Sequence, residues 1–215
     1  MTVVVKLMPN GYMAQREMQT LRLFQARPHA NIVRGMCAVN SGTFVVAVQA
    51  FVPGGTLADF AMDDVTWRSV TLQLTFACLE WYDSYKFVYM NWHSKNVLMD
   101  ATEESAATYA ALGETWRVAD LGGVRPVLTD FSRANIVGAT PKPWTLASAL
   151  GILWDMMQHT APPDVRQRVG EFSIEAGECT SVSALLAVVQ AFSTSSSTSA
   201  NECSAPLKST GVPSG

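Results

Sequence analysis

The chain has 215 residues, 48% of them hydrophobic and 15% charged, with a formal net charge of −3. A chain of this length can bury on the order of 70% of its unfolded surface, which predicts one domain or two small lobes. The slightly acidic composition provides no basic stripe for a phosphate backbone, so nucleic acid is excluded as the main partner.

Residues 1–55 alternate short apolar runs with one amphipathic segment. Residues 3–5 (Val-Val-Val) are β-branched, as is typical of a strand. Two further apolar runs, 32–39 and 44–48, flank residues 40–42 (Asn-Ser-Gly), and this arrangement predicts a β-hairpin.

Between these runs, Glu17, Leu21 and Phe24 recur at helical spacing. The Glu17 carboxylate therefore shares a helix face with two core side chains. Both a solvated role and an inward role stay open for it, because an acidic residue on a helix is usually solvated but this one has apolar neighbours.

A long helix follows. Asp63 or Asp64 can cap its N-terminus, and a helical stripe of apolar side chains extends through the segment. The stripe consists of Trp67, Val70, Leu74, Ala77, Trp81 and Tyr85. This helix leads the chain directly into a loop that contains Asn91.

After the loop, the sequence predicts β structure. Residues 97–99 form a short apolar strand, residues 102–114 an Ala-rich polar insertion, and residues 116–118 and 125–128 a strand pair joined by Gly122-Gly123. We expect this hairpin to present Asp130 beside Asn96.

The remaining segments predict two helices and a tail. Residues 144–157 are almost uniformly apolar and predict a buried helix, and residues 183–192 predict a closing helix. From residue 193 to residue 215, Ser, Thr, Ala, Gly and Pro dominate. Such a segment cannot offset its ordering entropy, so we expect it to be disordered.

The cysteines and the hydropathy pattern predict an intracellular protein, cytoplasmic or nuclear. No C-x-x-C pair occurs and no His lies at metal-ligand spacing, so we interpret the cysteines as reduced thiols, with Cys37 and Cys78 in the core. No apolar stretch approaches the ~20 residues that span a bilayer, and the N-terminal apolar run contains Lys6 without a charged region before it. We expect no membrane partner.

The loop after the long helix reads Phe-Val-Tyr-Met-Asn-Trp-His-Ser-Lys-Asn-Val-Leu-Met-Asp over residues 87–100. It resembles the catalytic loop of the protein kinases, in which H-R-D is followed by four variable residues and an Asn. In that family the Asp receives the substrate hydroxyl proton and the Asn holds a second Mg²⁺. Asn96 falls on the metal-binding Asn, whereas Asn91 stands where the Asp is expected.

Other segments resemble the same family in the same order, and the match spans roughly residues 3–158. They resemble the strand with the phosphate-binding Lys, the helix with its ion-pairing Glu, the turn into the next strand, the hinge, and the D-F-G segment. In this sequence they are residues 3–6, 16–18, 29–33, 51–57 and 127–133. The resemblance implies an α+β, two-lobe fold with a truncated N-terminal β lobe in residues 1–55 and a helical C-terminal lobe in residues 56–192.

The resemblance also implies ATP and Mg²⁺ as cofactors and a protein as substrate or binding partner. Lys6 would contact the nucleotide phosphates and Glu17 would pair with it, over a shorter separation than is usual in the family. Asp130 and Asn96 supply the carboxylate and amide oxygens that Mg²⁺ prefers. The alternatives are a turn role for Asp130 and a capping role for Asn96.

His93 lies two positions after Asn91, where protein kinases commonly carry a Lys that contacts the γ-phosphate. A His at this position resembles the D-L-H pattern of small-molecule kinases such as the aminoglycoside and choline phosphotransferases. We therefore name Asn91 and His93 as candidate catalytic residues. A His that only hydrogen-bonds within its loop is the alternative.

Two departures from the family pattern leave three hypotheses open. The amide of Asn91 cannot accept a proton as a carboxylate does. No G-x-G-x-x-G loop occurs in the sequence, so either the protein starts upstream of Met1 or the β lobe is incomplete. The first hypothesis is a divergent protein Ser/Thr kinase, similar to the kinases of large DNA viruses; a viral kinase would act in the host cell. The second is a pseudokinase that serves as a binding or scaffolding module. The third is a small-molecule phosphotransferase.

Overall fold

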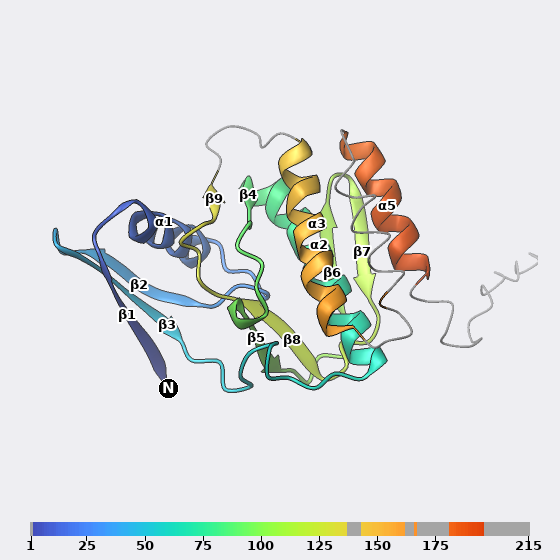
Figure 1. The fold of residues 1–215 in the computed structure, drawn as a ribbon, viewed down its shortest axis with the longest axis horizontal. Coiled ribbons are helices and arrows are strands. Elements are labelled where there is room, and N and C mark those ends of the chain that lie inside the picture. The colour runs from blue at the N-terminus through green and yellow to red at the C-terminus, as the bar shows by residue number, and fades with distance from the viewer. Residues whose placement is uncertain (1, 137–142, 162–165, 167–180, 196–215) are drawn as a thin grey trace, which may run out of the picture.

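The structure is a computed structural model that describes residues 2–136, 143–161, 166 and 181–195. Helices and strands are both abundant, so the predicted α+β class is confirmed. A small antiparallel sheet with one helix lies at one end of the molecule. Within the described residues, the other end holds three further helices together with further strand pairs (Figure 1).

The small sheet consists of β1 (Val3–Pro9), β2 (Gly35–Asn40) and β3 (Phe44–Ala50), in the spatial order β1-β3-β2. Both pairings are antiparallel, and β2 and β3 form the predicted hairpin. Helix α1 (Tyr12–Ala26) covers the face on which every second β3 side chain is buried. The buried apolar side chains on this side include Leu21, Phe24, Val45 and Ala47.

Helix α2 (Asp64–Tyr85) begins as predicted. The Asp63 carboxylate accepts a hydrogen bond from the Thr66 amide at 2.8 Å and thereby satisfies a free N–H group of the first turn. After the helix, β4 (Phe87–Val88) pairs with β9 (Asn135–Ile136). The predicted apolar stripe is buried from Trp67 to Trp81, with Trp67, Val70, Leu74, Ala77 and Trp81 at most 2% exposed, whereas Tyr85 at its end is half-buried.

Helix α3 (Pro143–Thr160) is the predicted buried helix, and it packs against α2. Two indole N–H groups bind across the interface. Trp154 Nε1 donates to Thr75 Oγ1 at 2.9 Å, and Trp67 Nε1 donates to the Met157 carbonyl at 3.1 Å. These bonds satisfy polar atoms that would otherwise be costly to bury.

Two predictions about position need correction. Helix α5 (Val182–Ser195) is the predicted closing helix but continues to Ser195, so residues 193–195 are helical, while residues 196–215 lie outside the described residues. Cys78 is buried as expected, whereas Cys37 is exposed because it lies on the outer face of β2, away from α1.

In the described part of the chain, no helix combines the length and apolarity needed to cross a membrane.

The predicted strand pair around Gly122-Gly123 is wrong in its partners. Strand β5 (Val97–Ala101) pairs with β8 (Val124–Leu128), and β6 (Ala107–Ala111) pairs with β7 (Glu114–Val118), both antiparallel. The second pair turns at Leu112-Gly113, where both residues have positive φ, as a tight hairpin requires. Residues 107–111, which we predicted to belong to a polar insertion, are therefore a strand, with Tyr109 only 4% exposed.

The connection between α1 and β2 fastens the small sheet to β8. The Val33 amide donates to the Leu128 carbonyl at 2.9 Å, and the Leu128 amide donates to the Asn31 carbonyl at 2.8 Å. The Asn31 side chain also donates to the Pro126 carbonyl at 2.9 Å. Because Asp130 lies only two residues beyond the end of β8, these bonds position it relative to the small sheet.

Gly54 lies too close to β5 to carry a side chain. A Cβ at this position would lie 1.7 Å from the Met99 carbonyl oxygen. We predict that Gly54→Ala lowers the free energy of unfolding by ~1–3 kcal/mol, the usual range for overpacking, as measured by urea denaturation. Gly11→Ala is the matched control, since nothing lies within 4 Å of its added Cβ and a loss below ~1 kcal/mol is expected. Equal losses in both variants would contradict the close packing.

Candidate functional site

Lys6 and Glu17 form an ion pair between β1 and α1. The Lys6 Nζ lies 2.9 Å from Glu17 Oε1, and the two side chains are 28% and 1% exposed. Lys6 alternates with the outward-facing residues of β1 and therefore points toward the helix. The short separation in sequence does not prevent the pairing, because only two residues separate the end of β1 from the start of α1.

The buried carboxylate of Glu17 has further donors. Its Oε2 accepts from the Phe131 amide at 2.7 Å, and its Oε1 accepts from Gln49 Nε2 at 3.3 Å. Gln49 Oε1 in turn accepts from Thr129 Oγ1 at 3.3 Å. A buried charge is tolerated when it is paired and hydrogen-bonded in this way. Of the two roles left open for Glu17, the inward one is therefore correct.

Gln49 is a residue of this network that was not predicted from the sequence. It is an amide in an otherwise apolar strand and is 2% exposed. A polar side chain at an inward position of a strand predicts a buried hydrogen-bond partner, and this signal was available in the sequence.

Asp130 lies two residues after the end of β8 with φ of 57°, a left-handed conformation that Asp adopts more readily than most residues. Its Oδ1 accepts from Ser132 Oγ at 2.8 Å and from the Ser132 amide at 3.3 Å. Its Oδ2 accepts from Asn91 Nδ2 at 3.3 Å. The carboxylate is half-buried and faces the loop that contains Asn91.

Asn96 holds this loop in shape. Its Nδ2 donates to the Asn91 carbonyl at 3.0 Å, and its own backbone carbonyl accepts from the Thr129 amide at 3.0 Å. The expected position of Asp130 near Asn96 is thus realised, but through pairing of β5 with β8 rather than through the predicted hairpin. The Asn96 side-chain oxygen is the atom left to act as a ligand.

Tyr89 is a buried neighbour of the site, and its role was also not predicted from the sequence. It is fully buried, and its hydroxyl lies 3.0 Å from the Thr129 carbonyl and 3.1 Å from the Asp130 carbonyl, to which it donates. Burial, followed by the negative charge of Asp130, raises the pKa of the phenol well above its ordinary value. Tyr89 is therefore a neutral donor that fixes the backbone around Asp130.

His93 does not join this network within the described residues. It is exposed, and its Nδ1 accepts from the Lys95 amide at 3.1 Å at the start of a short 3₁₀ helix, Ser94–Asn96. The contact matches the alternative that we left open, a His bonded within its own loop. Its side chain lines a separate cavity of about 260 Å³ together with Asp155 and His159.

The predicted residues that meet at the site are one lysine, two carboxylates and two amides, and Gln49 adds a third amide. The structure brings Lys6, Glu17, Asn91, Asn96 and Asp130 into one hydrogen-bonded neighbourhood. Among the described residues, no group of three or more His, Cys, Asp or Glu side chains is arranged to hold a metal ion. A cation at this site would have to take its ligands partly from the protein and partly from a bound substrate and water.

Comparison with family models and with curated proteins assigns no relative to the chain. No protein-family model matches it, and no curated protein matches it either. The chemistry of the site is accordingly inferred from its own residues.

Proposed function

We propose that the chain is a divergent protein kinase-like phosphotransferase that binds ATP with Mg²⁺ and acts on Ser or Thr of a protein. The supporting observation is a continuous series of contacts. It runs from Lys6 through Glu17 to the backbone amide of Phe131, the residue that follows Asp130. Lys6 lies at one end of this series of contacts, and at the other end the Asn91 side-chain amide donates to the Asp130 carboxylate. We interpret the small sheet with α1 as an N-terminal lobe and the helical part as a C-terminal lobe.

Lys6 is suited to hold nucleotide phosphates. An exposed Lys would sample many rotamers, but the buried Glu17 carboxylate fixes its ammonium group and leaves it partly accessible. Such pre-organisation lowers the entropy that a ligand must overcome on binding. Because both oxygens of Glu17 are occupied, it acts as a positioning residue and does not contact the substrate.

The residues present fit Mg²⁺. Asp130 offers a carboxylate and Asn96 an amide oxygen, the hard oxygen ligands that this ion prefers. When bound, Mg²⁺ would neutralise phosphate charge during transfer. Asp130 and Asn96 would hold it, with Asn91 and Ser132 restraining the Asp130 carboxylate.

Asn91 limits the proposed reaction. In phosphoryl transfer the substrate hydroxyl oxygen forms a bond to the γ-phosphorus, the bond to the departing ADP oxygen breaks, and the hydroxyl proton must leave. An amide does not accept this proton, so it must pass to a phosphate oxygen or to water. We therefore expect slow transfer, since a positioned base typically contributes ~10²–10⁴-fold.

The same residue supports the alternative of a pseudokinase that binds a partner. Asn91 donates to Asp130 instead of accepting a proton, and the sequence lacks G-x-G-x-x-G. A nucleotide would then be a structural ligand and the protein a scaffold.

Magnesium-dependent binding of ATP tests the proposal. Stabilisation by a ligand at ten times its Kd is ~1.4 kcal/mol, which raises Tm by roughly 3–6 °C in a protein of this size. We expect this shift with ATP and Mg²⁺, a clearly smaller one with ATP and EDTA, and loss of the Mg²⁺ effect in Asp130→Ala. Glu103→Ala, at an exposed carboxylate, is the control and should keep the full effect. Equal shifts with and without Mg²⁺, or an undiminished shift in Asp130→Ala, would refute the metal role.

A further inference from the structure

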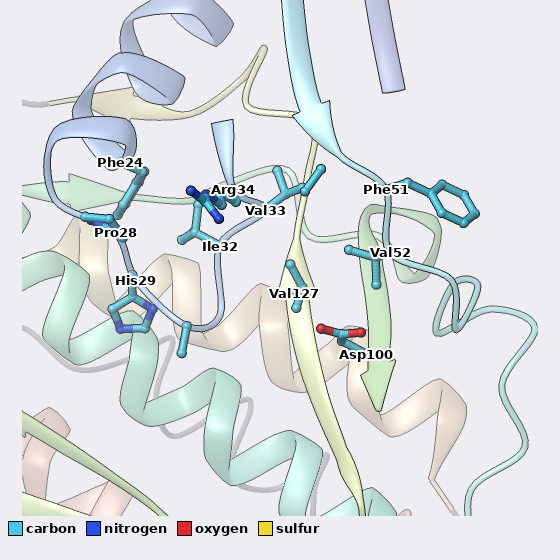
Figure 2. A pocket seen from close by; sticks show the side chains of 12 residues that line it. Phe24, Pro28, His29, Ile32, Val33, Arg34, Phe51, Val52, Asp100 and Val127 are labelled. Carbon is cyan, nitrogen blue, oxygen red and sulfur yellow. The ribbon is translucent and has the colours of Figure 1, made fainter. Parts of the chain in front are cut away.

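A second cavity, of about 340 Å³, lies where the α1–β2 connection meets the end of β3 and the β5–β8 pair (Figure 2). It shares no residue with the network around Asp130. Its walls are mainly apolar, and its apolar lining includes Phe24, Ile32, Val33, Val52 and Val127. The volume falls at the lower end of the range for small-molecule sites, which suits a ligand of about one ring and a short chain.

The cavity is built from firmly held residues. Phe24, Ile32 and Val127 are at most 5% exposed. The segment from Asn31 to Val33 is hydrogen-bonded to β8 through backbone groups at 2.8–2.9 Å. A ligand would therefore enter a preformed space, which favours binding because little has to be ordered.

Asp100 is the unusual residue of the lining. It is half-buried at the end of β5, beside Val52 and Val127 in Figure 2. In the described part of the chain its carboxylate has no hydrogen bond or ion pair. Arg125, its register partner on β8, donates instead to Glu104 at 2.6 Å. A half-buried carboxylate beside apolar walls, with no partner among the described residues, is open to a cationic ligand.

The other charged groups of the lining do not compete for this role. His29 is already engaged, because its Nδ1 accepts from the Asn31 amide and its Nε2 lies 3.7 Å from Glu80. Arg34 is exposed, and its guanidinium is solvated, so it is expected to contribute little to binding. Asp100 therefore determines the charge that the cavity selects.

We propose that this cavity is a binding site for a small hydrophobic amine, with its ammonium group on Asp100 and its apolar body against Phe24, Ile32 and Val127. The inference is independent of the proposed phosphoryl transfer, because none of the residues that line this cavity belongs to the network around Asp130. Charge-assisted hydrogen bonds to a carboxylate are about twice as strong as neutral ones. The site should therefore discriminate between ligands of equal shape by their charge.

Three probes that share one apolar body test this inference on the full chain. They are 4-phenylbutylamine, 4-phenyl-1-butanol and 4-phenylbutyrate, titrated at pH 7 and followed by NMR. We expect the amine to bind with a Kd of about 1 mM, typical of so small a ligand, and roughly tenfold more tightly than the alcohol. The carboxylate should bind most weakly.

Two variants locate the discrimination. Asp100→Asn is nearly isosteric and should reduce the preference for the amine over the alcohol to less than about twofold, whereas Arg34→Gln should leave it unchanged. The proposal would be overturned, without any variant, if 4-phenyl-1-butanol or 4-phenylbutyrate bound the unmodified chain as tightly as 4-phenylbutylamine. An unchanged preference in folded Asp100→Asn, or no amine binding at 10 mM, would overturn it as well.

Discussion

Replacing Asn91 by Asp is expected to raise phosphoryl transfer ~10²–10⁴-fold, the contribution typical of a positioned general base. The substitution is nearly isosteric. The backbone carbonyl of residue 91 still accepts from Asn96 Nδ2, so the loop keeps its shape. Transfer of ³²P from ATP to a general protein substrate and to the chain itself measures the change.

The same substitution has an electrostatic consequence. Asn91 Nδ2 now donates to Asp130 Oδ2 at 3.3 Å, and a second carboxylate there would face the first without a donor between them. Like charges at this distance repel, so Asn91→Asp should be less stable than the original chain in EDTA and should recover with Mg²⁺. Asn91→Ala is the control, since it removes the hydrogen bond but adds no charge.

The outcomes distinguish the enzyme from the binding module. Activity that is absent both before and after the substitution, in a chain shown to bind ATP with Mg²⁺, would favour the scaffold. Substantial activity with Asn91 in place would mean that another group assists the hydroxyl. His93→Ala then tests whether its imidazole does so, although His93 is bonded to the Lys95 amide.

Removing the Glu17 carboxylate should cause the largest loss of stability among single changes at the site. Glu17→Ala leaves the Phe131 amide without its acceptor and Lys6 without its partner. Breaking a buried pair by removing one member typically costs ~3–5 kcal/mol, and here the partly exposed Lys6 favours the lower end. Urea denaturation followed by tryptophan fluorescence measures the loss.

Matched variants separate charge from hydrogen bonding at this position. Glu17→Gln keeps an acceptor and should lose less stability than Glu17→Ala, while Glu103→Gln, at an exposed carboxylate, should change it by less than ~0.5 kcal/mol. The Lys6 ammonium is no longer fixed in either Glu17 variant, so both should also weaken ATP binding. Wild-type stability in Glu17→Ala would contradict the buried network.

Local signals in the sequence determined most elements of secondary structure. The Asp63 cap, the apolar spacing from Trp67 to Trp81 and the turn at residues 40–42 each act within a few residues, so they could be recognised without knowledge of the fold. The candidate residues Lys6, Glu17, Asn91, Asn96 and Asp130 came from a resemblance of motifs in order. Their roles stay predictions.

Strand partners were decided only by the tertiary structure. Gly122 and Gly123 both have positive φ and look like a hairpin turn, but a Cβ at Gly122 would lie 3.1 Å from Thr66 Oγ1. The glycine there allows close approach to α2 instead of joining two paired strands. A strand pairs where its buried face completes a core, and the residues that form this core are distant in sequence.

The same reason explains the missed residues. Gln49 and Tyr89 become part of the site only because β3, α1 and the end of β8 meet around Glu17 and Asp130. In the sequence, Asp100 looks like an ordinary residue near the end of a strand. It lines a cavity only because the α1–β2 connection, which is distant in sequence, packs beside it. Sequence patterns report the neighbours of a residue along the chain, whereas burial and hydrogen bonding depend on neighbours that only folding brings together.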